Sequence, residues 1–279
     1  MQPIRSFLKW AGAKTRLVPA IRELAPPEPY RLIEPFVGSA VVALNLCCSK
    51  NLLADANRDL IDVYRELKGT REDFIDECDK LFAPKNNQPS AFYALRDEFN
   101  ATLDRRRKAC LFVYLNRHGY NGLCRYNASG GFNVPFGRYV RPRLPRAAME
   151  AFHALLQNCT LRCADFRAVL AEAGEGDFVY CDPPYVPASA TANFTDYARG
   201  GFGAQDQADL AEHCRRAAQR GACVMVSNHD TAETRKLYRG ADEIRELSVR
   251  RRISCNAAKR TNARELIVVF RPARVARAV

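Results

Sequence analysis

The sequence predicts an α/β protein in which a doubly wound, mostly parallel sheet with an antiparallel edge carries an inserted, mainly helical domain. Short apolar runs rich in β-branched residues alternate with segments of helical periodicity along much of the 279 residues, which is typical of parallel sheets. The last two apolar runs have no helical segment between them, so we expect them to pair antiparallel at one edge. Between residues 57 and 145 the alternation gives way to consecutive helical segments.

The predicted strands are apolar runs bounded by turn residues, at 31–34, 52–54, 160–163, 178–181, 223–227, 244–249 and 266–270. The helical segments that separate most of them lie at 40–48, 166–173, 205–219 and 231–238. Within the insertion, helices are predicted at 57–67, 71–81, 91–104 and 108–116, followed by a loop or hairpin rich in Gly, Asn and aromatic residues. We therefore divide the chain into a sheet domain, 1–56 and 146–279, and an inserted domain, 57–145.

Composition argues against several classes of protein. No apolar run approaches the roughly 20 residues that a membrane span requires, and the first residues lack the basic-then-apolar layout of a signal peptide. The 11 cysteines are an odd number, with no Cys-x-x-Cys pair and no His at ligand spacing. This usage argues against a disulfide framework and against a metal site, and it favours free thiols in the reducing cytoplasm.

The net charge of +12 is unevenly distributed. The segment 105–146 holds ten Lys or Arg and no Asp or Glu, whereas 57–104 holds seven basic and eleven acidic residues. From residue 245 onward there are ten basic residues against two acidic ones, and 147–244 holds nine against fourteen. Such basic blocks are typical of a surface that binds a polyanion. Ribosomal or acidic-protein partners would produce the same bias.

The most informative segment is the predicted strand 178–181, which runs into Asp182, Pro183, Pro184 and Tyr185. Asp182 and the Pro183 carbonyl can both accept hydrogen bonds from an exocyclic amine, and Tyr185 offers a ring for stacking. Two successive prolines fix φ and hence the direction of that carbonyl. The group is therefore suited to holding a flipped planar base. The alternative is an ordinary Pro-Pro turn with a half-buried Tyr.

The first predicted strand leads into a small-residue turn that contains Phe36 and Gly38, and the second ends at Asp55. A turn of this kind with an acidic residue about 20 positions later suits a nucleotide-like ligand, the carboxylate binding ribose hydroxyls. The turn lacks a full G-x-G-x-x-G and a phosphate-binding Lys, which favours S-adenosylmethionine over a pyrophosphate cofactor. Upstream, Lys14 can meet a methionine carboxylate and Trp10 can line the pocket. The alternatives are a plain strand-turn-helix and an N-terminal arm with a core Trp.

These motifs occur in a characteristic order: Phe7-x-Lys-Trp-Ala-Gly-x-Lys, then Glu34-Pro-Phe-x-Gly, then Asp55, then Asp182-Pro-Pro-Tyr. The order resembles one class of DNA adenine N6-methyltransferases, and the chain looks most like the Dam-type methylases that act on GATC. Segments 114–127, 133–139, 189–195 and 227–230 extend the resemblance, which runs from about residue 5 to 271. It implies a Rossmann-like methyltransferase sheet with an inserted target-recognition domain.

The resemblance implies transfer of a methyl group from S-adenosylmethionine to N6 of a flipped adenine in double-stranded DNA, leaving S-adenosylhomocysteine. The implied catalytic residues are Asp182, Pro183, Pro184 and Tyr185. The expected cofactor contacts are Trp10, Lys14, Phe36, Gly38, Asp55, Asp165, Phe166 and Asp182. Of these, Asp165 and Phe166 are expected to border the adenine of the cofactor. No metal and no membrane is expected to take part, and we expect a cytoplasmic, nucleoid-associated monomer on DNA.

The resemblance also implies the DNA contacts. Lys9 and Arg125 match residues that read the guanines at the two ends of the site, and Leu123 and Pro135 match residues that touch a thymine methyl. Tyr120 and Asn121 match residues that fill or brace the stack around the extruded adenine. The alternative for Arg125 is an ordinary surface arginine in a hairpin, with no role in base reading. The roles of two further basic groups remain open. Phosphate contact or simple solvation is expected of Arg138, Arg141, Arg143 and 105–107. A charged edge strand or a DNA contact is expected of 250–252.

Two residues depart from the family pattern. Ala13 and Ala40 stand where relatives commonly have Gly. Alanine is harmless where φ is negative and costly where φ is positive, so the two positions put cofactor affinity in question.

Other functions remain as alternatives. The same chemistry on a protein amide would favour Asn at position 182, and an RNA enzyme would lack the segment 120–125. A DNA-binding protein that has lost catalysis is supported only by Ala13 and Ala40. Family members serve mismatch-repair strand marking, replication timing or restriction-modification, and the sequence does not choose among these roles.

Overall fold

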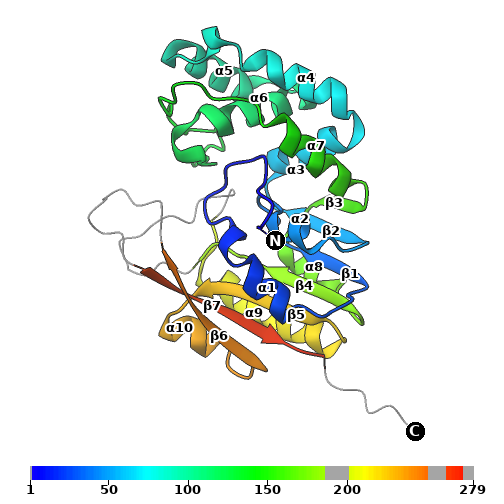
Figure 1. Ribbon diagram of the computed structural model, residues 1–279. Coiled ribbons are helices and arrows are strands. Elements are labelled where there is room, and N and C mark those ends of the chain that lie inside the picture. Colours follow the sequence, from blue (N-terminus) through cyan, green and yellow to red (C-terminus); the bar gives the residue numbers. More distant parts are fainter. Residues whose placement is uncertain (1, 186–200, 251–261, 273–279) are drawn as a thin grey trace.

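The computed structural model describes residues 2–185, 201–250 and 262–272. A layer of helices covers one end of a twisted sheet, and the N-terminal segment, dark blue in Figure 1, runs between the two. The strands are β1 (Arg31–Glu34), β2 (Asn51–Asp55), β3 (Cys159–Cys163), β4 (Asp177–Cys181), β5 (Cys223–His229), β6 (Glu243–Arg250) and β7 (Asn262–Phe270). All predicted strands are therefore confirmed within a few residues.

The sheet has the order β3-β2-β1-β4-β5-β7-β6. Strands β1 to β5 are parallel to one another, whereas β7 is antiparallel to both β5 and β6. The predicted mostly parallel sheet with an antiparallel edge is thus confirmed. The chain moves outward in one direction from β1 to β3 and in the other from β4 to β5. Ligands of open α/β sheets bind at such a reversal, outside the carboxyl ends of the strands.

Both faces of the sheet are buried, which explains the continuous apolar runs in its central strands. Along β4, Phe178 and Tyr180 point into one core while Val179 and Cys181 point into the other. The first core is covered by α1 (Val18–Leu24) and α2 (Val41–Leu46), and the second by α8 (Phe166–Ala171), α9 (Ala204–Gln219) and α10 (Ala232–Leu237).

The layer of helices between β2 and β3 contains α3 (Arg58–Gly69), α4 (Arg71–Leu81), α5 (Pro89–Ala101), α6 (Arg105–His118) and the 3-10 turns η2 (Pro84–Asn86) and η3 (Tyr120–Gly122). Helix α6 is buried nearly all round and contacts α3, α4 and α5. Asn57 and Asp104 cap α3 and α6 by accepting backbone N–H groups, which suits residues of this type. The predicted helices 57–67, 71–81, 91–104 and 108–116 are confirmed with small shifts at their ends.

Two helices were not predicted. Helix α1 is a single seven-residue stretch with Pro19 in its first turn, too short to display a clear period. Helix α7 (Arg146–Leu156) follows the Pro-rich end of the basic block and contacts α3, α4 and β3. No helix within the described ranges is long and apolar enough to cross a membrane.

Candidate active site and DNA-binding surface

Asp182 directly follows β4, at the point where the order of the strands reverses between β1 and β4. The parallel register pairs Cys181 of β4 with Val226 of β5, so the next residues, Asp182 and Ser227, are neighbours. The Ser227 hydroxyl donates to Asp182 Oδ1 at 3.0 Å. Burial raises the pKa of Asp182, and the charge of Lys14 opposes that rise. The carboxylate is therefore held in place by a hydroxyl on one side and a cation on the other.

Lys14 is the cation at this site. Its ammonium lies 2.7 Å from Asp182 Oδ1, donates to the Gly12 carbonyl at 2.6 Å, and sits 4.6 Å from the centre of the Tyr185 ring. The side chain is almost fully buried. Lys14, expected to meet a methionine carboxylate, thus occupies the space between Asp182 and Tyr185 in this structure.

Tyr185 is fixed at both ends. Its hydroxyl donates to Glu265 Oε2 at 3.1 Å, and its ring meets His229 edge-on at 4.6 Å between centroids. Glu265 was not anticipated, because it stands just before the predicted apolar run 266–270, in the more polar first half of β7. The ring is consequently presented in one orientation.

Asp55 ends β2 beside the turn that follows β1. Its Oδ2 accepts the Gly38 N–H at 3.0 Å and its Oδ1 accepts the Asn57 N–H at 2.9 Å. A carboxylate has about four lone-pair positions, so acceptor capacity remains for a ligand hydroxyl. Burial raises the pKa of Asp55, and the backbone bonds oppose the rise.

Gly38 and Trp10 pack against each other. Gly38 has a φ of +44°, and a Cβ there would lie 2.6 Å from the indole Nε1 of Trp10. Only glycine allows this approach. The N-terminal segment is therefore seated directly on the turn between β1 and α2.

Aromatic rings lie beside this turn. Phe36 stacks on Phe166 with centroids 5.3 Å apart, and Phe202 meets Phe36 edge-on at 5.7 Å. Asp165 caps α8 and forms an ion pair with Arg167 at 3.2 Å. Phe202 was not predicted, since it stands in an irregular Gly-rich segment before α9. Asp55, Lys14 and these rings together could hold a nucleoside that carries a charged tail.

Lys9 is tied to the helical layer. Its backbone N–H and carbonyl bond to the Asn116 side chain at 2.8 and 2.7 Å. Its ammonium donates to the Arg117 carbonyl at 3.1 Å and lies 3.6 Å from the centre of the Tyr139 ring. Burial, and to a smaller extent the charge of Arg117, lowers the pKa of Lys9 to about 8.

The turn η3 presents Tyr120 and Asn121 beside Lys9. Tyr120 is 49% exposed, and its N–H donates to the Pro135 carbonyl at 2.8 Å. Asn121 and Gly122 both have positive φ, and a Cβ at Gly122 would lie 2.2 Å from Lys9 Cβ. The structure therefore brings Lys9, Tyr120, Asn121 and Pro135 together.

Arg125 and Arg138 lie on the surface beyond this turn. Arg125 is exposed and donates to the Asn133 side chain at 2.7 Å and to its carbonyl at 3.2 Å. Arg138 is also exposed, with a φ of +53°. Leu123 is half-buried and packs against the core. Residues 189–195, Arg251 and Arg252, singled out from the sequence, lie outside the described residues.

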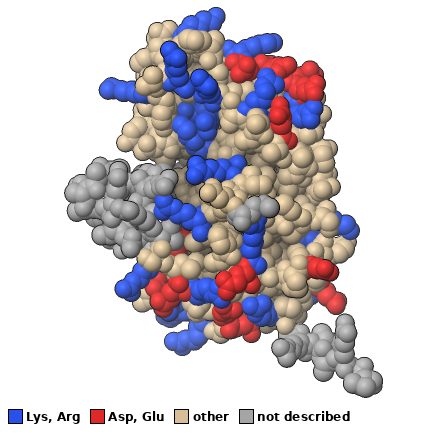
Figure 2. Space-filling model, viewed as in Figure 1, with Lys and Arg blue, Asp and Glu red and all other residues tan. Residues whose placement is uncertain are grey.

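The cations of the acid-free block 105–146 fall into two groups. One group is ion-paired with acids of α3, α4 and α5, as in the pairs Arg106–Glu77 at 2.5 Å, Arg107–Glu98 at 2.6 Å and Lys108–Asp59 at 3.4 Å. Within the described ranges, Arg125, Arg138, Arg141 and Arg143 have no carboxylate partner. Lys and Arg gather in a column that descends the helical layer towards the sheet (Figure 2).

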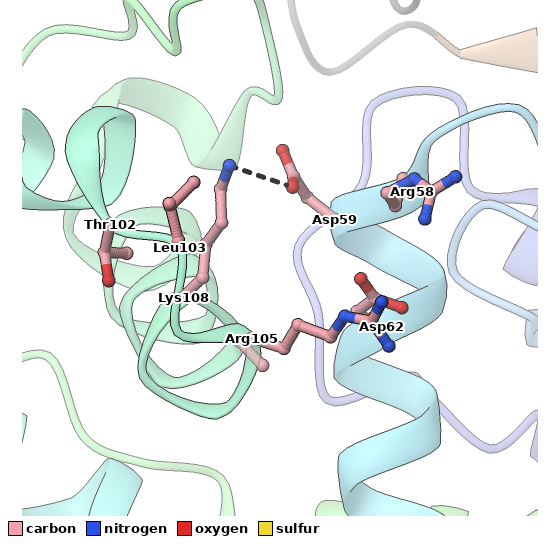
Figure 3. Close-up of a pocket in the computed structure, with 8 residues that line it drawn as sticks. Arg58, Asp59, Asp62, Thr102, Leu103, Arg105 and Lys108 are labelled. Carbon is pink, nitrogen blue, oxygen red and sulfur yellow. Dashed lines mark ion pairs between the residues drawn. The ribbon is translucent and has the colours of Figure 1, made fainter.

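A cavity of about 180 Å³ opens between α3 and α6. Its lining includes none of Asp182, Pro183, Pro184 and Tyr185, which we call the tetrad. Figure 3 shows the Lys108–Asp59 ion pair across it. Asp59 also accepts a hydrogen bond from the Tyr126 hydroxyl at 2.7 Å. These contacts support the segment that carries Arg125. The lining of the cavity includes none of the predicted catalytic or cofactor-binding residues.

Comparison with known proteins gives consistent results. A family model described as D12 class N6 adenine-specific DNA methyltransferase matches residues 10–253. The chain is 45% identical to a protein named DNA adenine methylase from Vibrio cholerae over 273 residues, which cover 98% of each chain. It is 45% identical to a protein of the same name from Salmonella typhi and 44% identical to one from Escherichia coli K12, covering 98% of this chain and 97% of each relative.

Proposed function

Because the chain belongs to the D12 class N6 adenine-specific DNA methyltransferase family, we propose that it methylates N6 of an adenine flipped out of duplex DNA, within GATC, with S-adenosylmethionine as the donor. The observation that carries the proposal is the position of Asp182 and Tyr185. Asp182 follows β4 at the reversal of the strand order, and Lys14, which contacts both Asp182 and the Tyr185 ring, belongs to the same N-terminal segment as Lys9, which bonds to α6.

The residues around that turn fit the proposed donor. Asp55 retains acceptor capacity for ribose hydroxyls, Phe36 and Phe166 offer rings to an adenine, and Lys14 is a cation for a carboxylate. When bound, the donor supplies a methyl group on a positively charged sulfur. We propose Trp10, Lys14, Phe36, Gly38, Asp55, Asp165, Phe166 and Asp182 as its contacts.

The proposed reaction begins with extrusion of the base, because adenine N6 is inside the stack and its lone pair is delocalised into the ring. Extrusion costs a few kcal/mol of stacking and pairing. Tyr185 then stacks on the base, while Asp182 and the Pro183 carbonyl accept its two N6 hydrogens. These contacts favour tetrahedral geometry at N6 and leave its lone pair free to form the bond to the methyl group, in line with the sulfur–methyl bond of the donor that would break. The proton that N6 then loses would pass to Asp182 or to solvent. The Asp182 carboxylate stabilises the positive charge that grows on N6.

Lys14 has to move for this to happen. Its ammonium now contacts Asp182 Oδ1 at 2.7 Å and lies 4.6 Å from the centre of the Tyr185 ring, in the space that the extruded base would take. An exchange of partners, from Asp182 to the carboxylate of the donor, would free the site. We therefore expect productive capture of the base to follow cofactor binding.

Specificity is proposed to come from Lys9 and Arg125, each reading a guanine at one end of the site. Lys or Arg to guanine O6 and N7 is the commonest specific contact, and a bidentate pair discriminates by about 1–3 kcal/mol. Leu123 and Pro135 are proposed to contact thymine methyl groups, and Tyr120 and Asn121 to support the opened stack. On this proposal residues 57–145 form the target-recognition domain.

Methyl incorporation from labelled S-adenosylmethionine into unmethylated plasmid tests the function. Digestion with a nuclease that GATC adenine methylation blocks then tests the site. We expect label together with protection, and neither with Asp182→Ala, which removes the proposed acceptor but keeps DNA affinity within severalfold. Label without protection would eliminate GATC. Absence of label from folded, DNA-binding protein would favour a non-catalytic DNA-binding role.

Arg125→Ala provides a separate test of base reading. We expect it to relax base choice at one end of the site while non-specific binding changes little, because an exposed guanidinium aimed at a base contributes mainly to discrimination. Arg141→Ala, which removes the same charge from another exposed position, is the matched control. Competition binding with single-base variants of the site measures both. A uniform loss across all sequences would make Arg125 a phosphate contact.

A further inference from the structure

The carboxyl end of β5 meets the tetrad at three consecutive residues. Ser227, Asn228 and His229 belong to the segment 227–230 that resembles the family, and the proposed reaction assigns them no role. Ser227 and Asn228 are fully buried although both are polar. Buried polar side chains in strands need specific partners. The partners of all three lead to members of the tetrad.

Ser227 connects Tyr180 to Asp182. The Tyr180 hydroxyl donates to Ser227 Oγ at 3.0 Å, and Ser227 Oγ donates to Asp182 Oδ1 at 3.0 Å. A serine hydroxyl has one hydrogen, and the Cys181 carbonyl, another acceptor near it, is farther away at 3.5 Å. The bond from Tyr180 occupies a lone pair of Ser227 and so directs that single hydrogen towards the carboxylate.

Gln207 connects Asn228 to the second proline. Gln207 is 3% exposed on α9, and its Nε2 donates to the Pro184 carbonyl at 2.7 Å. Asn228 Nδ2 donates to Gln207 Oε1 at 3.1 Å, and Asn228 Oδ1 accepts the His229 N–H at 2.9 Å. Because both prolines have fixed φ, anchoring the Pro184 carbonyl also limits the direction of the Pro183 carbonyl before it.

We propose, on the basis of the proposed function, that Ser227 and Gln207 are positioning residues for the methyl-transfer step. Ser227 aims the Asp182 carboxylate, and Gln207, oriented by Asn228, holds the Pro-Pro segment so that its carbonyl and the carboxylate converge on one amine. Alternate side chains of a strand point to opposite faces. Ser227 and Asn228 therefore point to opposite faces of the sheet. Ser227 contacts Asp182 on one face, and Gln207, bonded to Asn228, contacts Pro184 from the other.

The protonation of Asp182 reports on the Ser227 contact. The charged or titratable groups that face Asp182 come from several elements and are Lys14, Glu34, Tyr180, Tyr185 and Glu265. Burial raises the pKa of Asp182, whereas Lys14 and the Ser227 hydrogen bond lower it. Loss of the Ser227 hydroxyl should raise this pKa further. The acid limb of the pH–rate profile should then move to higher pH.

Steady-state kinetics on duplex DNA test the proposal. We expect Ser227→Ala to lower kcat by about 10-fold or more, the scale of a hydrogen bond to a charged group, with KM for DNA and for the cofactor within about twofold. Ser227→Thr, which keeps the hydroxyl, should restore most of the loss. Gln207→Met should lower kcat without moving the acid limb. Gln205→Met, on the exposed side of the same helix, should behave like wild type.

A second measurement does not require turnover. With ¹³C-labelled aspartate carboxyl groups, NMR titration follows Asp182, whose signal Asp182→Asn identifies by its disappearance. Ser227→Ala should raise that pKa, and Tyr180→Phe should raise it by less. If the wild type does not methylate DNA, the proposed function fails while this shift still tests the contact. If Ser227→Ala does not fold, Tyr180→Phe carries the test.

Three results would overturn the inference. One is an unchanged kcat and acid limb in folded Ser227→Ala. The second is an Asp182 pKa that is indifferent to both Ser227→Ala and Tyr180→Phe. The third is a loss in Gln205→Met equal to that in Gln207→Met, which would reduce Gln207 to a structural role in α9.

Discussion

At the scale of single residues, Ala13 and Ala40 are not equivalent. Ala13 has a φ of −51°, which any residue adopts, whereas Ala40, the residue before α2, has a φ of +51°. A left-handed conformation costs an L-residue roughly 1–2 kcal/mol. The departure from glycine is therefore harmless at position 13 and strained at position 40, next to the turn that holds Gly38.

Ala40→Gly should leave the free energy of unfolding nearly unchanged. Relief of the strain offsets the lost buried methyl, about 0.8 kcal/mol, and the added freedom of the unfolded chain. Ala43→Gly is the matched control, since Ala43 is equally buried but lies within α2. It should lose about 2 kcal/mol, from helix propensity and the methyl together. Urea unfolding measures both, and equal losses would contradict the strain at Ala40.

Glu34 is the other unusual residue. It ends β1, is fully buried, and accepts the Ala43 N–H at 2.8 Å. Burial raises its pKa to about 8, and the charge of Asp182 adds to the rise. A carboxyl whose pKa is higher in the folded protein than in the unfolded chain stabilises the fold below the unfolded value. That stability is lost as pH rises through the folded value.

Wild-type stability should therefore fall as pH rises from about 6 to 8.5, by an amount on the order of 2 kcal/mol that Glu34→Gln should not lose. The glutamine keeps an acceptor for the Ala43 N–H but cannot ionise. Glu150→Gln, on the exposed face of α7, is the control and should follow wild type. Denaturant unfolding at several pH values measures the difference. Parallel curves for wild type and Glu34→Gln would show that Glu34 does not titrate in this range.

At the scale of elements, the N-terminal segment 7–14 connects the helical layer to residues that follow β1 and β4. Lys9 is bonded to Asn116 of α6, Trp10 packs on Gly38 after β1, and Lys14 pairs with Asp182 after β4. Asn116 also donates to the Gly122 carbonyl of η3 at 3.3 Å. One buried amide thus holds both the N-terminal segment and the turn that presents Tyr120.

Asn116→Ala should release this segment. We expect faster amide hydrogen exchange over residues 7–14, a loss of about 2–3 kcal/mol in stability, and weaker discrimination at the base read by Lys9. Asn100→Ala is the control, because Asn100 makes a similar pair of bonds to the Phe132 backbone and none to the N-terminal segment. Exchange measured by mass spectrometry separates the two variants. Equal exchange over 7–14 in both would refute the role given to Asn116.

The elements were predictable where the chemistry is local. Periodicity located the strands and the long helices, but it began α6 at 108 and assigned Asp104, the actual cap of α6, to the preceding helix. Helix α1 was missed because seven residues carry too little pattern, and the sign of φ at Ala40 was left open because residue type alone does not fix it. The bond between Ser227 and Asp182 joins residues 45 positions apart. Such a contact depends on strand register, which one sequence does not reveal.

At the scale of the whole molecule, the pairing of charges distinguishes two uses of the basic residues. Arg106 and Arg107 form ion pairs with acids of the helical layer. Their charge therefore stabilises the packing of α6 against α4 and α5. Arg141 and Arg143 are exposed with no carboxylate partner within the described ranges. The net charge of +12 therefore overstates the positive charge that is available to a polyanion, and we propose that the unpaired cations form the polyanion-binding surface.

Arg141→Ala and Arg143→Ala should each weaken binding to DNA of any sequence and reduce the slope of log affinity against log salt by about 1. Arg106→Ala, which removes the same charge from a paired site, should lower stability and leave the slope nearly unchanged. Fluorescence titration at several salt concentrations measures all three. A slope change for Arg106→Ala as large as that for Arg141→Ala would mean that the ion pairs open on DNA.

The placement of the N-terminal segment has a consequence for biosynthesis. The backbone of Lys9 bonds to a residue made 107 positions later, and the partner of Lys14, Asp182, is made later still. Because a chain folds in the order of its synthesis where it can, this segment leaves the ribosome well before its partners and is among the last to find its place. A nascent chain stalled within the helical layer would therefore expose Trp10 and Lys14, and it would lack the Lys14–Asp182 contact and the residues proposed to act in methyl transfer.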